Sequence, residues 1–449
     1  MQSSPRILLI STYFDANLPS GGVLYSIDLA REWLARGRSV AVLCADLDRS
    51  LGDLQPFVES GALELHPLIS TEDVRFTHHP NTRLEQRTRE FIHAYEPDLI
   101  HVHNWQGMLS AVTAAVDSET PVIYTALDFG LLCFNFYLDD GSASPCTGPE
   151  SASKCAACVG HRVNGPARWL APMLPRRATR AIWPRYVKLD QVKSSEALQE
   201  RMRHVLRHVD AVIAPSPIMA DRLIAYGTPA HRVHHIGYGL NAGKILRPEK
   251  SESPSLRLGF FGGVAPIKGL QVLTDAASRL PNGLPLEIRV FGVATAAGRV
   301  PSYDDTAKQY LVHVPAVFGK ALADAHADLD AVLVPSQWHE NAPFVVLESL
   351  ANGTPVIAAN QAGIAHLVTP GQNGWLLSPS DPDAWAAAMI RAAQHPGTLR
   401  RMRPGARYER TLATFADDVD RVEHSMRSIE KMRTPARIIP QRVQRVMQP

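Results

Sequence analysis

The sequence predicts an α/β protein made of two Rossmann-like domains in tandem, each built on a parallel sheet with helices on both faces. Two observations support this fold class. Short apolar runs alternate with amphipathic helical patterns along nearly the whole chain, which is typical of parallel strands joined by crossover helices. The alternation stops at a polar, proline-bearing stretch at 241–254 and then begins again, which indicates a linker between two domains.

The bulk properties narrow the class of protein. The 449 residues suffice for two or three domains, and 45% hydrophobic with 20% charged residues is typical of a globular chain. A net charge of +2 is low for a nucleic-acid binder, so we expect no nucleic-acid partner. No apolar run approaches the roughly 20 residues of a membrane helix, and the run at 7–10 is too short for a signal peptide. We therefore expect a cytoplasmic protein.

The first domain is expected to span 1–245. It opens with a strand at 6–10, a glycine loop at 19–22 and a helix to Ala35 whose apolar residues form one stripe. Gly37 ends this helix. Further strands are expected at 40–44, 98–102, 121–125, 210–214 and 232–236.

An insertion at about 126–190 breaks the rhythm of the first domain. It contains four cysteines with the spacing C-x12-C-x8-C-x2-C: Cys133, Cys146, Cys155 and Cys158. In a reducing compartment such a cluster is more typical of a metal site than of disulfides. Three alternatives stay open, namely a structural zinc, an iron–sulfur cluster and thiols without a metal.

A basic stretch follows within 161–208, where 11 Lys or Arg residues stand against 3 Asp or Glu. Trp169, Trp183 and Tyr186 are interleaved with these charges. Such a run is typical of a solvated helical face. It also fits contact with an anionic acceptor or with anionic lipid, which would place the protein at the inner face of the membrane.

The second domain is expected to span 246–405. A C-terminal helix at 406–432 is expected to pack back on the first domain, followed by a loose tail at 433–449. An Asp-x-Asp pair at 328–330 flanks a predicted strand and is interpreted as turn residues. The strands of this domain are expected at 256–261, 286–291, 310–314, 330–334 and 355–358.

The most informative segment runs from Pro335 to Asn360 and reads as loop, helix, turn and strand. The loop follows a strand, and ligands of open α/β sheets bind beyond the carboxyl ends of the strands. Pro343 suits the first turn of the helix, which leaves the backbone N–H groups of Phe344 and Val345 free to face an anion. The segment therefore predicts a phosphate-binding helix start.

Charged side chains complete the predicted ligand site. Glu340 on the loop can accept hydrogen bonds from sugar hydroxyls, and Glu348, about one turn into the helix, can accept both hydroxyls of a ribose. A second glycine-bearing loop at 259–269 carries Lys268, a mobile point charge suited to a diphosphate. Together these residues predict a nucleotide-sugar site.

This combination resembles the retaining glycosyltransferases of family 4, in which two Rossmann-like domains of the GT-B fold face each other across a cleft. The carboxylate pair Glu340 and Glu348 lies in the matching context Pro335-Ser336, Glu340-Asn341 and Pro343-Phe344. The segment Cys133–Cys158 is similar to an insert of some bacterial members. The resemblance implies transfer of a sugar from UDP- or GDP-sugar to a glycan or lipid-linked hydroxyl, in cell-surface glycan synthesis and without a catalytic cofactor.

The resemblance also assigns roles to residues. Catalysis would involve Glu340 at the donor sugar, Lys268 at the diphosphate, and Asp128 and His103 at strand ends that line the cleft. The donor-binding residues would be Gly22, Gly263, Lys268, Glu340, Asn341, Phe344, Val345 and Glu348.

Three positions depart from the family pattern. Gly263 stands where an arginine is usual, Leu127 replaces the histidine of a His-Asp pair, and His366 replaces an acidic residue. These departures keep an alternative open: a non-catalytic member of the same fold that binds a nucleotide or a glycan.

Overall fold

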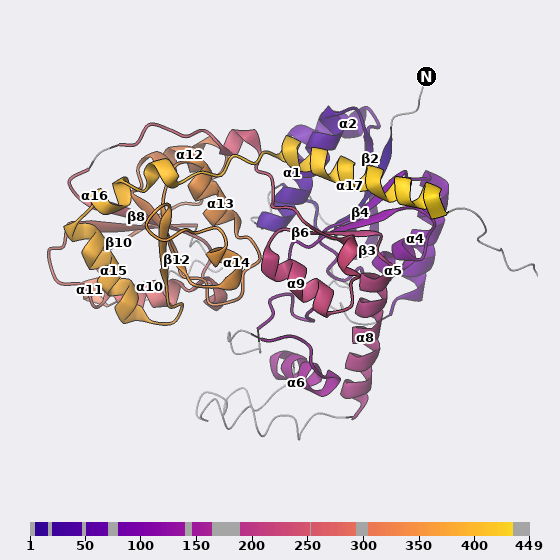
Figure 1. Cartoon of the computed structure of the whole chain (residues 1–449), viewed down its shortest axis with the longest axis horizontal. Helices are drawn as coiled ribbons and strands as arrows, with labels where there is room; N and C mark the ends of the chain where they lie inside the picture. Colours follow the sequence, from indigo (N-terminus) through magenta and orange to yellow (C-terminus); the bar gives the residue numbers. More distant parts are fainter. Residues whose placement is uncertain are drawn as a thin grey trace, which may run out of the picture.

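The computed structural model describes residues 5–16, 20–46, 51–70, 80–139, 146–163, 189–251, 253–292 and 304–433. Two parallel sheets form two lobes, as Figure 1 shows. The first sheet has the order β3-β2-β1-β4-β5-β6-β7 and the second the order β10-β9-β8-β11-β12-β13. This arrangement confirms the predicted fold class. The expected tail and most of the basic stretch lie outside the described residues.

The strands of the first sheet agree closely with the expected ranges, except that β3 was not expected. They are β1 (Arg6–Ile10), β2 (Ser39–Asp46), β3 (Leu63–Ser70), β4 (Leu99–Val102), β5 (Val122–Thr125), β6 (Ala211–Ala214) and β7 (Val233–His235). In the second sheet, β13 is the additional strand. Its members are β8 (Leu256–Phe261), β9 (Leu286–Phe291), β10 (Leu311–Val314), β11 (Ala331–Val334), β12 (Val356–Ala359) and β13 (Gly374–Leu377).

Helices cover both faces of each sheet. In the first lobe they are α1 (Gly21–Ala35), α2 (Gln55–Glu59), α4 (Thr82–Tyr95), α5 (Leu109–Val116), α6 (Ala152–Val163), α8 (Leu189–His208) and α9 (Pro217–Ala225). Those of the second lobe and the C-terminal helix are α10 (Leu270–Ala277), α11 (Asp305–Lys308), α12 (Lys320–Ala327), α13 (Phe344–Ala351), α14 (Ala362–Ala365), α15 (Pro382–Gln394), α16 (Gly397–Arg400) and α17 (Leu412–Arg433). Among the described helices, none combines the length and apolar character that crossing a membrane requires.

The central strands are mostly apolar because each sheet is buried on both faces. In β1, Leu8 and Ile10 belong to one hydrophobic cluster, whereas Ile7 and Leu9 belong to the cluster on the opposite face. Successive side chains of a strand point to opposite faces, so an uninterrupted apolar run fills both layers. The parallel sheets bring the carboxyl ends of their strands, and the loops that follow them, to one edge of each lobe.

The chain crosses between the lobes twice, along neighbouring paths. Leu240 pairs with Thr411 in an isolated bridge, and Leu412 donates a backbone hydrogen bond to Leu240. After this crossing α17 lies across the first lobe beside α1 (Figure 1), where Arg36 and Arg38 form ion pairs with Asp417 and Asp420. The helix begins at Leu412 rather than near 406 because the preceding residues are extended in this crossing.

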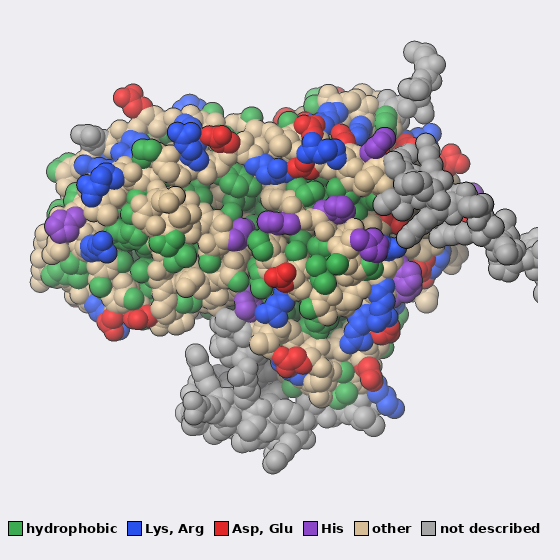
Figure 2. Space-filling model, in the orientation of Figure 1, with side chains coloured by type: hydrophobic (Ala, Val, Ile, Leu, Met, Phe, Trp, Pro, Cys, Tyr) green, Lys and Arg blue, Asp and Glu red, His purple; other side chains and the backbone are tan. Residues whose placement is uncertain are grey.

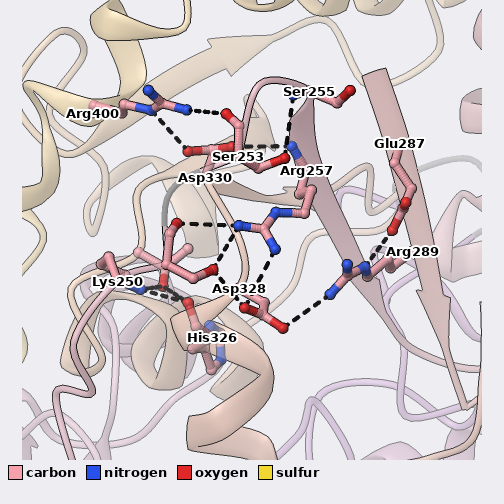
Figure 3. A network of polar contacts seen from close by, with 12 residues as sticks. Lys250, Ser253, Ser255, Arg257, Glu287, Arg289, His326, Asp328, Asp330 and Arg400 are labelled. Atoms are coloured by element: carbon pink, nitrogen blue, oxygen red, sulfur yellow. Dashed lines mark hydrogen bonds and ion pairs between the residues drawn. The ribbon is translucent and has the colours of Figure 1, made fainter. Parts of the chain in front are cut away.

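A polar network closes the end of the second sheet that lies opposite to the carboxyl ends of its strands (Figure 3). Asp330, which is almost fully buried, accepts hydrogen bonds from Arg400 and Arg403, and Asp328 accepts from Ser251. Lys250 of the linker donates to the carbonyl oxygen of His326, and burial lowers the pKa of Lys250 to about 7. The Asp-x-Asp pair therefore has a structural role in this lobe.

Candidate active site between the two domains

The loop between β11 and α13 holds a buried carboxylate. Glu340 is 4% exposed, and its Oε1 atom accepts hydrogen bonds from the hydroxyl of Ser336 at 2.8 Å and from Nζ of Lys268 at 3.0 Å. A buried charge without partners is strongly unfavourable, and the lysine and the hydroxyl supply partners for this carboxylate. The structure thus brings Glu340 and Lys268 together, as the sequence analysis predicts for one ligand site.

The backbone of this loop is strained. Glu340 has φ 44°, in the left-handed region that costs a non-glycine residue about 1–3 kcal/mol. Two glycines make room for the loop: a Cβ at Gly363 would come within 2.0 Å of the Glu340 carbonyl oxygen, and one at Gly269 within 1.9 Å of the Pro335 carbonyl oxygen. Strain of this kind is retained where the surrounding structure holds it for a functional geometry.

Lys268 combines an ion pair with access to solvent. It ends a short 3-10 turn (Pro266–Lys268), and 36% of its side chain is exposed. Its Nζ atom lies 5.3 Å from the ring centroid of Trp338, within the range of a cation–π interaction. Gly263, in the same loop region, has open space around it, because a Cβ there would meet no described atom within 4 Å. The backbone at Gly263 is therefore not closely packed against described atoms.

Asn341 connects the loop to the first lobe. Its amide nitrogen donates to the Ala126 carbonyl oxygen at 2.6 Å and to the Tyr238 hydroxyl at 3.1 Å, and its Oδ1 atom accepts from the Ser216 hydroxyl at 2.8 Å. Asn341 is predicted to bind the donor, but in the structure its amide already forms hydrogen bonds to the first domain. The structure favours a role for Asn341 in positioning its neighbour Glu340.

Glu348 is also engaged in this state. Nζ of Lys244, in the linker, lies 3.3 Å from the Glu348 carboxylate and 3.6 Å from that of Asp28 on α1. Burial raises the pKa of Glu348, and the lysine counteracts this rise. A ribose that bound Glu348 would therefore share this carboxylate with Lys244, an ion pair that local sequence patterns did not reveal.

The start of α13 packs against the first lobe. The ring of Phe344 stacks on Tyr238 with ring centroids 4.9 Å apart and lies 5.4 Å from Tyr25. A Cβ at Gly21 would come within 2.8 Å of the Phe344 ring, so the glycine loop lets α1 approach the helix start closely. Phe344, whose backbone N–H group is predicted to face an anion, thus lies against the first glycine loop and the aromatic rings of the first lobe.

The histidine expected at a strand end, His103, is buried. His103 is 2% exposed, and its Nδ1 atom is 2.9 Å from the Ser26 hydroxyl. Burial lowers the pKa of His103 to about 3, so this ring is neutral at physiological pH. Its Nε2 atom, like Nδ2 of Asn104, has no hydrogen-bond partner among the described residues. Asn104 lies directly against Gly22, where a Cβ would be 3.3 Å from its amide nitrogen.

Asp128 follows β5 and is partly buried. Its Oδ1 atom accepts a hydrogen bond from the Gly130 backbone N–H at 2.7 Å, and burial raises the pKa of Asp128 to about 7. Leu127, which precedes it, packs beside Gly22.

Histidines gather over α9 and α14 on the face shown in Figure 2. Burial lowers the pKa of His366, and the electrostatic effect of His235 lowers it further.

The four cysteines of the insert lie near one another, and the Cys146 carbonyl oxygen is 3.0 Å from Nε2 of His339. Asn135 lies between Cys133, whose thiol donates to its Oδ1 atom at 2.7 Å, and the Sγ atom of Cys158. Burial raises the pKa of both Cys133 and Cys155 to about 11. The electrostatic effect of Cys146 also raises the pKa of both thiols. Within the described residues, no group of three or more His, Cys, Asp or Glu side chains is arranged to hold a metal ion. The structural metal therefore stays a prediction.

Replacement of Gly363 by alanine tests the strained loop. The added methyl group would overlap the Glu340 carbonyl oxygen, so we expect the free energy of unfolding to fall by about 1–3 kcal/mol, as for overpacked sites. Chemical denaturation measures this change. Gly263→Ala is the matched control, because its methyl group has space, and it should shift stability by less than about 0.5 kcal/mol. Equal stability of the two variants would contradict the strained packing.

The raised pKa of Asp128 predicts a pH dependence of stability. Between about pH 4 and 7 the folded protein holds a proton that the unfolded chain releases, so this contribution is full below pH 4 and is lost as the pH rises through about 7. In Asp128→Asn the amide stays neutral. We expect denaturation from pH 5 to 8 to show a smaller loss of stability in the variant, by up to about 1.4 kcal/mol per pH unit below pH 7. Parallel stability curves would contradict the shift.

Solved structures of low sequence identity share the fold. The Anabaena protein HepE in complex with UDP aligns with a TM-score of 0.58 at 16% identity, over 95% of this chain and 100% of that chain. Sucrose-phosphate synthase from Thermosynechococcus elongatus aligns with a TM-score of 0.61 at 16% identity, over 95% and 98%. These likenesses confirm the GT-B arrangement of the two lobes.

Curated relatives are more similar over part of the chain. A GDP-mannose-dependent alpha-mannosyltransferase of Mycobacterium tuberculosis is 35% identical over 212 residues, which cover 44% of this chain and 53% of that protein. A D-inositol 3-phosphate glycosyltransferase of Xylanimonas cellulosilytica is 32% identical over 222 residues, covering 44% and 52%. The match thus spans about half the length of these relatives.

Two family models match in succession. The model of the glycosyl transferase 4-like domain matches residues 20–239, and the model of glycosyl transferases group 1 matches residues 255–395. The first contains nearly all of the seven-stranded sheet and the second the whole six-stranded sheet. The chain therefore belongs to the GT-B glycosyltransferases that combine a 4-like domain with a group 1 domain.

Proposed function

We propose that this protein is a retaining glycosyltransferase that moves a sugar from a UDP- or GDP-sugar to a hydroxyl of a glycan or lipid-linked acceptor. The observation that carries the proposal is the cluster of Lys268, Ser336 and Glu340 at the carboxyl edge of the second sheet, beside the start of α13. The names of the relatives support this donor class, since one is GDP-mannose-dependent, and HepE is in complex with UDP.

The charges of the cluster suit this reaction. As the donor bond breaks, negative charge develops on the departing diphosphate, and Lys268 together with the N–H groups at the start of α13 would stabilise it. The acceptor hydroxyl attacks from the face that the nucleotide leaves, and the departing phosphate takes its proton. Glu340 would hold the donor sugar near the reacting carbon, and Glu348 would accept the ribose hydroxyls. The protein thus mainly positions the reactants, and no catalytic cofactor is required.

We infer a role in cell-surface glycan synthesis at the cytoplasmic side of the membrane. The basic stretch 161–208 would make the peripheral contact with that membrane. The cysteine cluster is proposed as a structural zinc or iron–sulfur site. Metal analysis and visible absorbance of the purified protein distinguish zinc, an iron–sulfur cluster and free thiols.

A second candidate function is binding without turnover. The ion pair between Lys244 and Glu348 favours it, because it occupies the carboxylate that would hold the ribose, and Gly263 lacks the usual arginine charge. A thermal-shift screen of UDP-, GDP- and ADP-sugars identifies the ligand. Binding of a nucleotide sugar with neither hydrolysis nor transfer to glycosides would favour this second candidate.

Removal of the paired charges tests the proposed catalysis. In Lys268→Ala and in Glu340→Ala we expect release of nucleoside diphosphate to fall by about 100-fold or more, the usual effect of losing a group that stabilises developing charge. The assay follows diphosphate release with the best donor of the thermal-shift screen. Lys308→Ala is the control, because Lys308 is an exposed helix residue that forms an ion pair with Asp305, and its activity should be unchanged. Unchanged turnover in both site variants would disprove the assignment of this site.

A further inference from the structure

We propose that Tyr137 is the platform on which the acceptor sits, and that the acceptor presents a pyranose ring whose C–H face stacks on the tyrosine ring. This inference rests on the proposed glycosyl transfer and specifies its second substrate. It assigns a binding role to a residue of the cysteine-bearing insert, close to the cluster of Lys268 and Glu340.

Tyr137 differs from its neighbours in exposure. The segment 126–139 that follows β5 is rich in large apolar side chains, and Tyr137 is 38% exposed. Among the described residues of this segment, it is the one exposed large hydrophobic side chain. The other large apolar side chains that the segment buries are Phe129, Leu131, Leu132, Phe134, Phe136 and Leu138.

The backbone holds Tyr137 outward at a cost. Phe136 and Leu138, the residues on either side, both have positive φ angles, of 67° and 48°. Side chains disfavour this region, so two such residues in succession around one exposed ring require the surrounding structure to hold them. The simpler interpretation, a tyrosine exposed by chance on a relaxed loop, does not explain this paired strain.

Specific contacts enforce the strained conformation. Phe129 donates a backbone hydrogen bond to the Phe136 carbonyl oxygen, and Oδ1 of Asn135 accepts from the Tyr137 backbone N–H at 3.0 Å. The same Oδ1 atom accepts from the Cys133 thiol, which links the loop to the cysteine cluster. A Cβ at Gly130 would come within 2.6 Å of the Phe136 ring, so this glycine is needed for the close packing.

A short series of contacts joins Tyr137 to the proposed reaction centre. Its ring meets Trp338 of the second lobe edge to face, with centroids 5.2 Å apart and an interplanar angle of 82°. Nζ of Lys268 lies 5.3 Å from the same Trp338 ring and 3.0 Å from Glu340. The tyrosine therefore lies on the first lobe, directly across from the groups that would hold the donor sugar and its diphosphate.

The chemistry of the surface favours a sugar ring. A pyranose has an apolar C–H face and a rim of hydroxyls, so its apolar face can stack on one exposed aromatic ring while its hydroxyls stay in water. A lipid chain would need a continuous apolar patch, but among the described residues around Tyr137, Trp338 and Phe129 are buried and Tyr137 is the exposed ring. A nucleotide base also stacks on aromatic rings, yet the groups suited to the nucleotide lie on the second lobe, at Lys268 and α13.

Saturation-transfer NMR with the whole chain tests the platform. The probes are methyl α- and β-glycopyranosides of glucose, galactose and mannose, with UDP or GDP present. We expect transfer to the axial ring protons in the wild-type protein and in Tyr137→Phe, and at least a fivefold loss in Tyr137→Leu. Phe318→Leu, which removes another exposed ring on the second lobe, is the matched control and should bind the glycosides like the wild type.

The outcomes separate the two proposals. Equal glycoside signals in Tyr137→Leu and the wild type, or no glycoside signal in the wild type, would overturn the platform. So would weaker UDP or GDP binding in Tyr137→Leu, because it would show that the ring holds the nucleotide. Ring-dependent glycoside binding supports the platform even if the wild type turns over no nucleotide sugar, a result that would count against the proposed transfer alone.

Discussion

The buried carboxylate of Glu340 is the constraint on which the site depends. A carboxylate removed from water needs hydrogen bonds or an opposite charge, and here Ser336 and Lys268 supply both. This requirement determines where the loop after β8 must lie, since it has to bring Lys268 across to the loop after β11. Gly269 permits that approach, because the Pro335 carbonyl oxygen occupies the space of a side chain. The positions of the two loops, their backbone strain and their charges therefore depend on one another.

The same loop also sets the relation between the lobes. Asn341, next to Glu340, is hydrogen-bonded to Ala126, Ser216 and Tyr238 of the first lobe. A movement of the lobes would break these buried hydrogen bonds, each of which contributes about 0.5–1.5 kcal/mol. Because Asn341 and Glu340 are adjacent in the backbone, the same movement would shift the carboxylate. The closure of the two lobes and the geometry of the proposed donor site are thus coupled through a single peptide unit.

Sequence patterns revealed the repeating parts of the fold and the local parts of the site. Apolar runs predicted eleven of the strands because most buried parallel strands are apolar on both faces, whereas β3 and β13, two of the four edge strands, were missed. In β3, Pro67 and alternating polar residues resemble a loop, and an edge position tolerates the missing N–H. Glu340, Lys268 and the helix start follow from spacing along the chain. The pairing of Lys244 with Glu348 and the contact of Trp338 with Tyr137 join residues about 100 and 200 positions apart, which no local pattern encodes.

The two carboxylates of the site are each paired with a lysine. Lys268 is paired with Glu340 and Lys244 with Glu348, so each of the two carboxylates already has a cation in the state described. A donor bound as proposed would not bring charge to an empty site but would exchange partners: its diphosphate would attract the lysines, and its hydroxyls would satisfy the carboxylates. Such an exchange conserves the number of buried interactions, so binding avoids leaving a buried charge unpaired. Affinity would then depend on the difference between two sets of ion pairs, and a ligand that supplied only the phosphates would leave both carboxylates without a full replacement.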